Sequence, residues 1–244
     1  MTPRIVLATA LRVLQQLSHD RRTVALVLLV PPVLLTLFKY VFYGQEETFD
    51  RIGAPLVGIF PFVSMFLVTS IAMLRERTTG TLERLMSMPL AKLDILLGYG
   101  IAFALVAAVQ ASLTAGVAFG LLGLDTAGPV WLVVGLAVTN ALLGMALGLF
   151  LSAFAQTEFQ AVQFMPAFIL PQILLAGLLV PRDQMARALE VVSNFMPLTY
   201  AYDALVRATA DDLGARLAFD VAVVLGCVVL ALVLGATTLR RRTA

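Results

Sequence analysis

The sequence predicts an all-α integral membrane protein, and three observations support this fold class. The chain of 244 residues is 60% hydrophobic and only 13% charged, with a mean hydropathy of +0.95, which is too apolar for a soluble domain. It contains repeated apolar runs of about 20 residues, the length that a helix needs to span a bilayer core roughly 30 Å thick. These runs lack the strict alternation expected of membrane β-strands.

Six apolar runs are long enough to be transmembrane helices, and a more polar segment precedes them. In residues 1–22, Leu7, Leu11 and Leu14 recur with helical spacing among polar residues, which is typical of an interfacial helix. Residues 23–244 form the predicted six-span domain. We expect its spans at residues 23–43, 54–74, 93–123, 130–155, 161–180 and 217–239.

Prolines are expected to bend two of these spans. Pro31 and Pro32 lie in the first span, and Pro166 and Pro171 lie in the fifth. Proline cannot donate a backbone hydrogen bond, so a membrane helix tolerates it where a neighbouring group satisfies the carbonyl that is left over. We therefore predict kinks at both places.

Glycines are expected to affect the third and fourth spans. Gly98 and Gly100 interrupt the apolar run of the third span, which predicts a late start for that helix. The spans also contain GxxxG pairs, which permit close approach of two helices and favour packing within one bundle. These pairs are Gly116 with Gly120, and Gly144 with Gly148.

The basic residues predict the orientation of the chain. Eleven of the 17 Lys and Arg residues fall on the side of the N-terminus, five fall on the other side, and Lys39 lies within a span. The positive-inside rule then places both termini in the cytoplasm. On the outer side, residues 181–212 are expected to form a cap of two short helices. The first is amphipathic and expected to lie against the membrane from outside, with Met185, Leu189 and Val192 on its apolar face.

A short polar segment at residues 75–89 separates the second and third spans. Gly80 is expected to end the helix of the second span, and Pro89 to end a new helix at about residues 80–89. Glu83 in the first turn complements the dipole of that helix. A helix of about two turns is not stable alone in water, so its apolar face should dock on another surface, or else lie on the membrane. The apolar residues of this face are Leu82, Leu85 and Met86.

Several classes of chemistry have no motif in the sequence. There is no GxxxxGK[ST] phosphate loop, no G-x-S-x-G elbow and no HExxH pair. His19 is the single histidine and Cys227 the single cysteine, which excludes a metal cluster of several histidines or a disulfide within the chain. We therefore do not expect an enzyme, and any energy from ATP must come from another polypeptide.

The polar segment resembles that of the permease subunits of ABC-2 type transporters, particularly the drug-exporter branch. The family pattern of a Glu, then Gly-Thr-Leu-Glu, then a Pro is met by Glu76, by residues 80–83 and by Pro89. The resemblance covers nearly the whole chain, including the external residues 194–200 and 203–207.

This resemblance implies that residues 81–88 form a coupling helix, which seats in a groove of a separate ABC-type ATPase subunit. ATP and Mg²⁺ would bind to that subunit, so no cofactor is expected in this chain. Two permease copies, as a homodimer or a heterodimer, would enclose the transport route near the first, second and fifth spans. The residues expected to couple to the ATPase are Glu76, Gly80, Thr81, Leu82, Glu83, Leu85 and Met86.

Aromatic and methionine side chains in the second and fifth spans are candidates for the substrate pathway, because such side chains adapt to many apolar shapes. Core packing or lipid contact explains them equally well. Lys39 either lines the outer part of the pathway or reaches the interface by snorkelling. The full set of candidates is Lys39, Phe60, Phe62, Met65, Phe66, Phe164, Met165 and Phe168.

The leading hypothesis is an export permease for hydrophobic small molecules, including drugs and antibiotics, in a prokaryotic plasma (inner) membrane, with no nucleic-acid partner. The chain has one tryptophan, Trp131, and five tyrosines. This favours such a cargo over a sugar polymer, whose exporters are usually richer in aromatic residues. The alternatives are an exporter of a lipid or a cell-envelope glycan, and a non-transporting membrane scaffold or sensor of the same fold.

Overall fold

The computed structural model of the protein describes residues 3–81 and 92–238, and the regular structure in these residues is helical. The long helices are α1 (Pro3–His19), α2 (Arg21–Val41), α3 (Glu46–Thr78), α5 (Lys92–Gly120), α6 (Val130–Leu151) and α11 (Ala215–Thr238). The shorter elements are α7 (Glu158–Phe164), the π-helical turn η1 (Met165–Ile169), α8 (Leu170–Leu175), η2 (Arg182–Gln184), α9 (Arg187–Ser193) and α10 (Pro197–Thr209).

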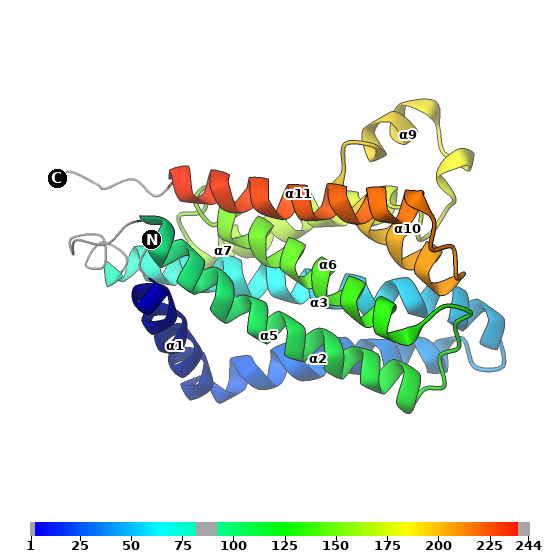
Figure 1. Ribbon diagram of the computed structural model, residues 1–244, viewed down its shortest axis with the longest axis horizontal. Helices are drawn as coiled ribbons and strands as arrows, with labels where there is room; N and C mark the ends of the chain where they lie inside the picture. Colours follow the sequence, from blue (N-terminus) through cyan, green and yellow to red (C-terminus); the bar gives the residue numbers. More distant parts are fainter. Residues whose placement is uncertain (1–2, 82–91, 239–244) are drawn as a thin grey trace.

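The helices form one elongated bundle (Figure 1). Helices α2, α3, α5, α6 and α11 run along its long axis, and α1 crosses one end of it. The last turns of α3 and α11 lie at this same end, whereas α9 and α10 lie at the opposite end. The topology therefore brings the end of α3, the start of α5 and the interfacial helix α1 together.

Five helices in the described part of the chain are long and apolar enough to cross a membrane: α2, α3, α5 from Leu97, α6 and α11. They confirm the predicted first, second, third, fourth and sixth spans. The predicted fifth span falls on α7, η1 and α8, which follow one another without a break from Glu158 to Leu175. The count of six spans stays a prediction.

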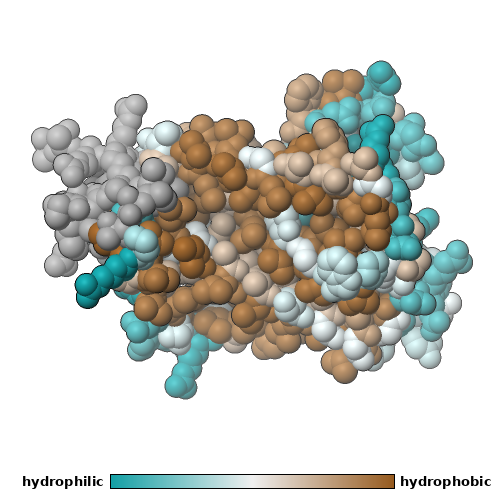
Figure 2. Space-filling view, viewed as in Figure 1, coloured by the Kyte–Doolittle hydropathy of each residue, from teal (hydrophilic) through white to brown (hydrophobic). Residues whose placement is uncertain are grey.

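The surface of the bundle agrees with a membrane location. Figure 2 shows hydrophobic residues over the middle of the visible face and hydrophilic residues at the end that carries α9 and α10. Large apolar side chains of α2, including Leu26, Leu29 and Leu37, are exposed around the bundle. In water such a surface would be unfavourable, whereas in hydrocarbon it matches the solvent.

Helix α3 is longer than the span predicted at residues 54–74, because it extends beyond the apolar run at both ends. Glu46 and Glu47 lie in its first turn, where acidic side chains interact favourably with the helix dipole. At the other end Arg75 and Arg77 occupy the last turn, where cations are favourable.

The prolines of the first span do not interrupt α2, which is helical from Arg21 to Val41. Pro31 cannot donate to the carbonyl of Val27, four residues earlier. The side chain of Gln110 on α5 donates to that carbonyl instead, with an Nε2–O distance of 2.6 Å, and Gln110 is fully buried. A neighbouring helix thus satisfies the backbone group that the proline leaves over.

The fifth span deviates from α-helical geometry where a proline kink was expected. Pro166 lies in η1, a π-helical turn between α7 and α8. Such turns inside a helix are frequent at functional sites. By contrast, Gly98 and Gly100 do not interrupt α5, which is already helical at Lys92, whereas its candidate membrane-spanning part begins at Leu97.

The centre of the bundle is the contact between α3 and α6, the most extensive helix pair in the described chain. A Cβ atom on Gly144 would overlap the carbonyl oxygen of Phe62, and one on Gly148 would overlap the side-chain oxygen of Thr69. This GxxxG pair therefore brings two helix backbones together, as expected.

The other GxxxG pair does not act in this way. Gly116 and Gly120 on α5 are exposed, and a Cβ atom at either position would meet no atom within 4 Å. The expectation that this pair packs within the bundle is wrong, since its side of α5 faces outward.

The contrast between the two pairs predicts opposite effects of one chemical change. Gly144→Ala should lower the free energy of unfolding by about 1–3 kcal/mol, because the added methyl group has no space and α3 must shift. Gly116→Ala should be neutral or slightly stabilising, because alanine favours helix and space is open. Thermal unfolding in detergent micelles measures both. Equal stability of the two variants would contradict the close contact of α3 and α6.

Candidate functional site

The candidate site begins where α3 ends. The helix stops at Thr78, and the backbone N–H of Thr79 donates to the carbonyl of Arg75 at 2.9 Å. Gly80 follows with φ +72°, in the left-handed region that glycine enters at little cost. The expectation that Gly80 ends this helix is confirmed, since a left-handed glycine after the last turn is a common helix stop.

Most of the predicted coupling helix lies outside the described residues. Thr81 is the last described residue before residues 82–91, and it is partly buried. The expected roles of the residues that follow stay predictions. These residues are Leu82, Glu83, Leu85, Met86 and Pro89.

Glu76, one turn before Gly80, forms the centre of a polar cluster that joins three helices. Its side chain on α3 is only 5% exposed and accepts a bond from Arg12 on α1, with an Nη2–Oε2 distance of 3.4 Å. The same Arg12 nitrogen also donates to the hydroxyl of Tyr99 on α5. The guanidinium carbon lies 5.7 Å from the centre of the Tyr99 ring.

The burial of Glu76 requires that its carboxylate keeps a cationic partner. A buried carboxylate is costly unless it is paired and hydrogen-bonded, and Arg12 supplies that pairing from another helix. Removing either partner leaves a buried charge or breaks the link between α1 and α3. The position of α1 is therefore coupled to the end of α3, directly before Gly80.

Close packing of α1 on α5 supports the same link. A Cβ atom on Gly98 would lie 2.5 Å from the Cβ atom of Thr9 and 3.0 Å from the carbonyl oxygen of Val6. Only glycine at this position allows α1 to approach α5 so closely. The sequence predicts that Gly98 interrupts the third span. In the structure Gly98 is instead the position on α5 against which α1 packs.

A second ion pair connects the same end of α3 to α7. Arg75 Nε lies 2.7 Å from Glu158 Oε1, and Arg75 Nη2 lies 3.1 Å from Oε2, which is a bidentate arrangement. The hydrogen bond from Arg75 lowers the pKa of Glu158. Both side chains are about half exposed, so this pair contributes less to stability than the buried one.

The turn between α1 and α2 is fixed by a helix cap. Asp20 accepts a hydrogen bond from the backbone N–H of Thr23 at 3.1 Å and one from its hydroxyl at 2.6 Å. These bonds lower the pKa of Asp20 and keep its carboxylate ionised at the start of α2. The chain therefore reverses from α1 into the first span at a defined residue.

A cavity of about 210 Å³ lies beside the cluster, between α1, α3 and α5. Polar side chains on its wall include Gln16, Asp20, Arg75 and Glu76. It is smaller than pockets that hold small molecules, which occupy about 300–1,000 Å³. The cavity is therefore not a candidate for the substrate site.

The candidate pathway residues of the second span lie mainly in the protein core. Phe62, Met65 and Phe66 are completely buried. Phe60 is partly buried, and its ring centre lies 5.9 Å from that of Phe38 on α2. These residues pack between helices here, and a pathway role for them stays a prediction.

The candidates of the fifth span are more accessible. Phe164 and Phe168 form an edge-to-face pair with ring centres 5.8 Å apart, and Phe168 is 48% exposed. Met165 begins the π-helical turn η1 and is partly buried. A pathway role for these side chains stays a prediction.

Lys39 contacts an aromatic ring rather than an acid in the described structure. Its Nζ atom lies 4.7 Å from the ring centre of Phe49 at the start of α3. A cation over a ring face is attracted by the ring electrons, and this attraction is stronger away from water. The contact joins the end of α2 to α3, and the choice between pathway lining and snorkelling for Lys39 stays a prediction.

The external segment has both expected helices. Leu189 and Val192 on α9 are exposed, and α9 projects from the bundle (Figure 1), so its placement against the membrane stays a prediction. Helix α10 is anchored in the bundle, with Leu198 and Leu205 completely buried.

Ion pairs fix α10 to its surroundings. Arg182 donates to Asp203 across the external segment, and Arg207 donates to Asp220 at the start of α11, with an Nε–Oδ2 distance of 3.2 Å. Burial raises the pKa of Asp203 to about 6, against the opposite effect of Arg182.

No group of histidine, cysteine and acidic residues that could hold a metal occurs within residues 3–81 and 92–238.

Sequence reasoning identified Glu76 but not its partners. Arg12 is one of the polar residues of the predicted interfacial helix, and nothing in the sequence marks it or Tyr99 as a partner of Glu76. A buried acid at the end of a span requires a cation, and Arg12 and Arg4 were both available on the preceding helix. The helical spacing of α1 alone does not decide between them.

Comparison with known proteins gives a consistent result. Residues 5–209 match the family model described as ABC-2 type transporter. The chain is 28% identical over 148 residues to the probable multidrug ABC transporter permease YbhR of Escherichia coli K12, covering 61% of this chain and 40% of that protein. It is 25% identical over 165 residues to ABC transporter G family member 20 of Dictyostelium discoideum, covering 67% of this chain and 23% of that protein. The chain thus spans less than half the length of these relatives.

The cluster around Glu76 predicts that α1 loosens when the acid is neutralised. Glu76→Gln should lower the stability of α1 attachment by about 1–3 kcal/mol, because Arg12 loses its charged partner. Hydrogen–deuterium exchange of peptides from residues 3–19, in micelles, should then be faster. Glu158→Gln removes an exposed partner of Arg75 and should change exchange in this segment little. Equal effects of the two changes would show that the buried pair does not hold α1.

Asp203 predicts a pH dependence of the external segment. Its pKa is raised from the ordinary value of 3.8 to about 6, so the folded protein holds this proton at a pH where the unfolded chain releases it. Stability from this group therefore rises as the pH falls from about 6 to about 4. Comparison of unfolding temperatures at several pH values should show this gain in the wild type and its loss in Asp203→Asn. The same change at exposed Asp183 should preserve the gain.

Proposed function

This chain belongs to the ABC-2 type transporter family, and on that premise we propose that it is the permease subunit of an ATP-driven exporter of hydrophobic small molecules. A separate nucleotide-binding subunit supplies the energy and carries ATP and Mg²⁺. The observation that carries the proposal is the buried Glu76, tied to α1 and α5 directly before the turn at Gly80. One relative is named as a probable multidrug permease, which supports hydrophobic drugs as the class of cargo.

The proposed coupling runs through the end of α3. A movement of residues 81–88, seated on the ATPase, reaches α3 across the turn at Gly80. The pair of Glu76 with Arg12 passes it to α1, and the pair of Arg75 with Glu158 passes it to α7. Both links lie within one helical turn, so one displacement moves three elements together.

Six crossings are part of this proposal, and the positions of the helix ends support it. Helix α1 and the end of α11 lie at the same end of the bundle, which requires an even number of crossings (Figure 1). Five long helices meet the length criterion in the described chain. The segment α7–η1–α8 starts at the α1 end, and the chain next reaches α9 at the opposite end, which supports a sixth crossing by this segment.

We further propose that two permease copies work together in a prokaryotic plasma membrane, with the termini in the cytoplasm. Only 22% of the most apolar window of α2 is buried, against 61% for both α3 and α6. Helix α2 thus has more free surface than α3 or α6 to offer to lipid or to a second copy. Eleven basic residues on the side of the termini support the orientation.

The turn at Gly80 provides the test of coupling. Gly80→Val forces a branched residue into the left-handed region, which costs about 1–2 kcal/mol, and alters the direction in which residue 81 leaves α3. We expect ATP hydrolysis by the co-purified ATPase to continue while dye or drug efflux from cells falls strongly. Glu83→Ala should have a similar effect on efflux.

Gly44 provides the matched control for this experiment. It also has a left-handed backbone, φ +78°, with open space around it, and it lies in the turn between α2 and α3, at the end of the bundle away from Gly80. Gly44→Val should therefore keep efflux coupled. If Gly80→Val leaves efflux from the cells unchanged, this chain does not take part in the transport, which favours a non-transporting scaffold. If only a lipid or a glycan stimulates ATP turnover, the cargo is that lipid or glycan rather than a drug.

A further inference from the structure

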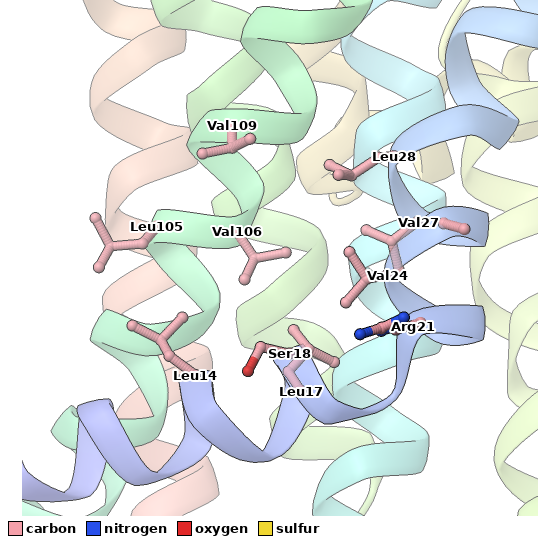
Figure 3. A pocket seen from close by; sticks show the side chains of 11 residues that line it. Leu14, Leu17, Ser18, Arg21, Val24, Val27, Leu28, Leu105, Val106 and Val109 are labelled. Atoms are coloured by element: carbon pink, nitrogen blue, oxygen red, sulfur yellow. The ribbon is translucent and has the colours of Figure 1, made fainter.

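An apolar groove lies where α1, α2 and α5 meet (Figure 3). Its volume is about 460 Å³, within the range of about 300–1,000 Å³ typical of sites for small organic ligands. Leu17 on α1, Val24 and Leu28 on α2, and Val106 and Val109 on α5 contribute to its walls. No pathway or coupling residue discussed above lines it.

The groove is polar at one end only. Figure 3 shows Arg21 and Ser18 beside the turn from α1 into α2, with aliphatic side chains along the rest of the groove. Arg21 is exposed. The nearest acid in the sequence, Asp20, uses both of its oxygens to accept hydrogen bonds from Thr23. The groove therefore combines a cationic mouth with an apolar interior.

The position of the groove in the membrane matches one lipid leaflet. Along α2 it extends from Arg21, the first residue of the helix, to Leu28, which is a distance of roughly 10 Å at 1.5 Å per residue. Half of a hydrocarbon core is about 15 Å thick. A ligand with its head at Arg21 would thus keep its tail within the leaflet on the side of α1.

We propose that this groove binds one acyl chain of an anionic glycerophospholipid, with the lipid phosphate at Arg21. The cationic mouth fits a phosphate, which accepts hydrogen bonds from guanidinium groups. The interior is lined from three helices and suits a single hydrocarbon chain. A lipid in this place contacts α1, α2 and α5 together and so holds the interfacial helix against the first and third spans.

Lipid binding to the full-length chain in detergent micelles tests the proposal. Native mass spectrometry with phosphatidylglycerol and with phosphatidylcholine of the same acyl chains gives the affinity for each. We expect tighter binding of phosphatidylglycerol. Arg21→Gln should weaken it about five-fold, the size of one basic contact to an anionic lipid. Arg22→Gln removes the same charge at a neighbouring exposed position outside the groove and should have a smaller effect.

A second pair of variants tests the apolar interior. Val109→Trp fills the groove and should weaken binding of phosphatidylglycerol more than about ten-fold, since the burial of two methylenes already gives that factor. Leu113→Trp adds the same side chain one turn further along α5, at an exposed position that does not line the groove, and should keep lipid binding.

Three results would overturn the proposal. One is equal affinity for the two lipids, or equal effects of the two arginine changes. Another is loss of dimers, rather than of lipid, in Val109→Trp, which would make the groove an interface between copies. The third is that Val109→Trp abolishes binding of a transported dye while phosphatidylglycerol still binds. That result would make the groove a cargo site.

Discussion

The close contact between α3 and α6 is the constraint on which the rest of the bundle depends. In hydrocarbon, apolar side chains gain little by leaving the solvent, so helices associate through tight packing and polar contacts. Gly144 and Gly148 provide that packing by letting the backbone of α6 touch the backbone of α3 at Phe62 and Phe66. With these two helices fixed, α5, α10 and α11 pack around α6.

Helix α3 is therefore a rigid central element with an unusual end. Its middle is buried among apolar side chains, whereas its last turn carries a buried acid and an exposed base that pair with two different helices. The structure separates two tasks along one helix. The middle supplies stability, and the end connects the bundle to the segment that follows Gly80.

The long helices could be predicted from the sequence because the length of an apolar run and the thickness of a bilayer determine them. The two GxxxG pairs could not be distinguished, since they have the same spacing and only the neighbouring helix shows which one is used. Glu76 was identified from the family pattern, but Arg12 and Tyr99 come from other helices, and nothing local marks them.

The hydrogen bond from Gln110 to the carbonyl of Val27 has a consequence for the evolution of the chain. Pro31 on α2 leaves that carbonyl without its usual backbone donor, and a residue on α5 provides the substitute. Neither residue can change freely while the other stays. Replacing Gln110 by leucine would leave a bare carbonyl in an apolar environment, but the same replacement in a relative without Pro31 would be acceptable. The two positions are therefore linked by selection, and substitutions at them should covary among homologues.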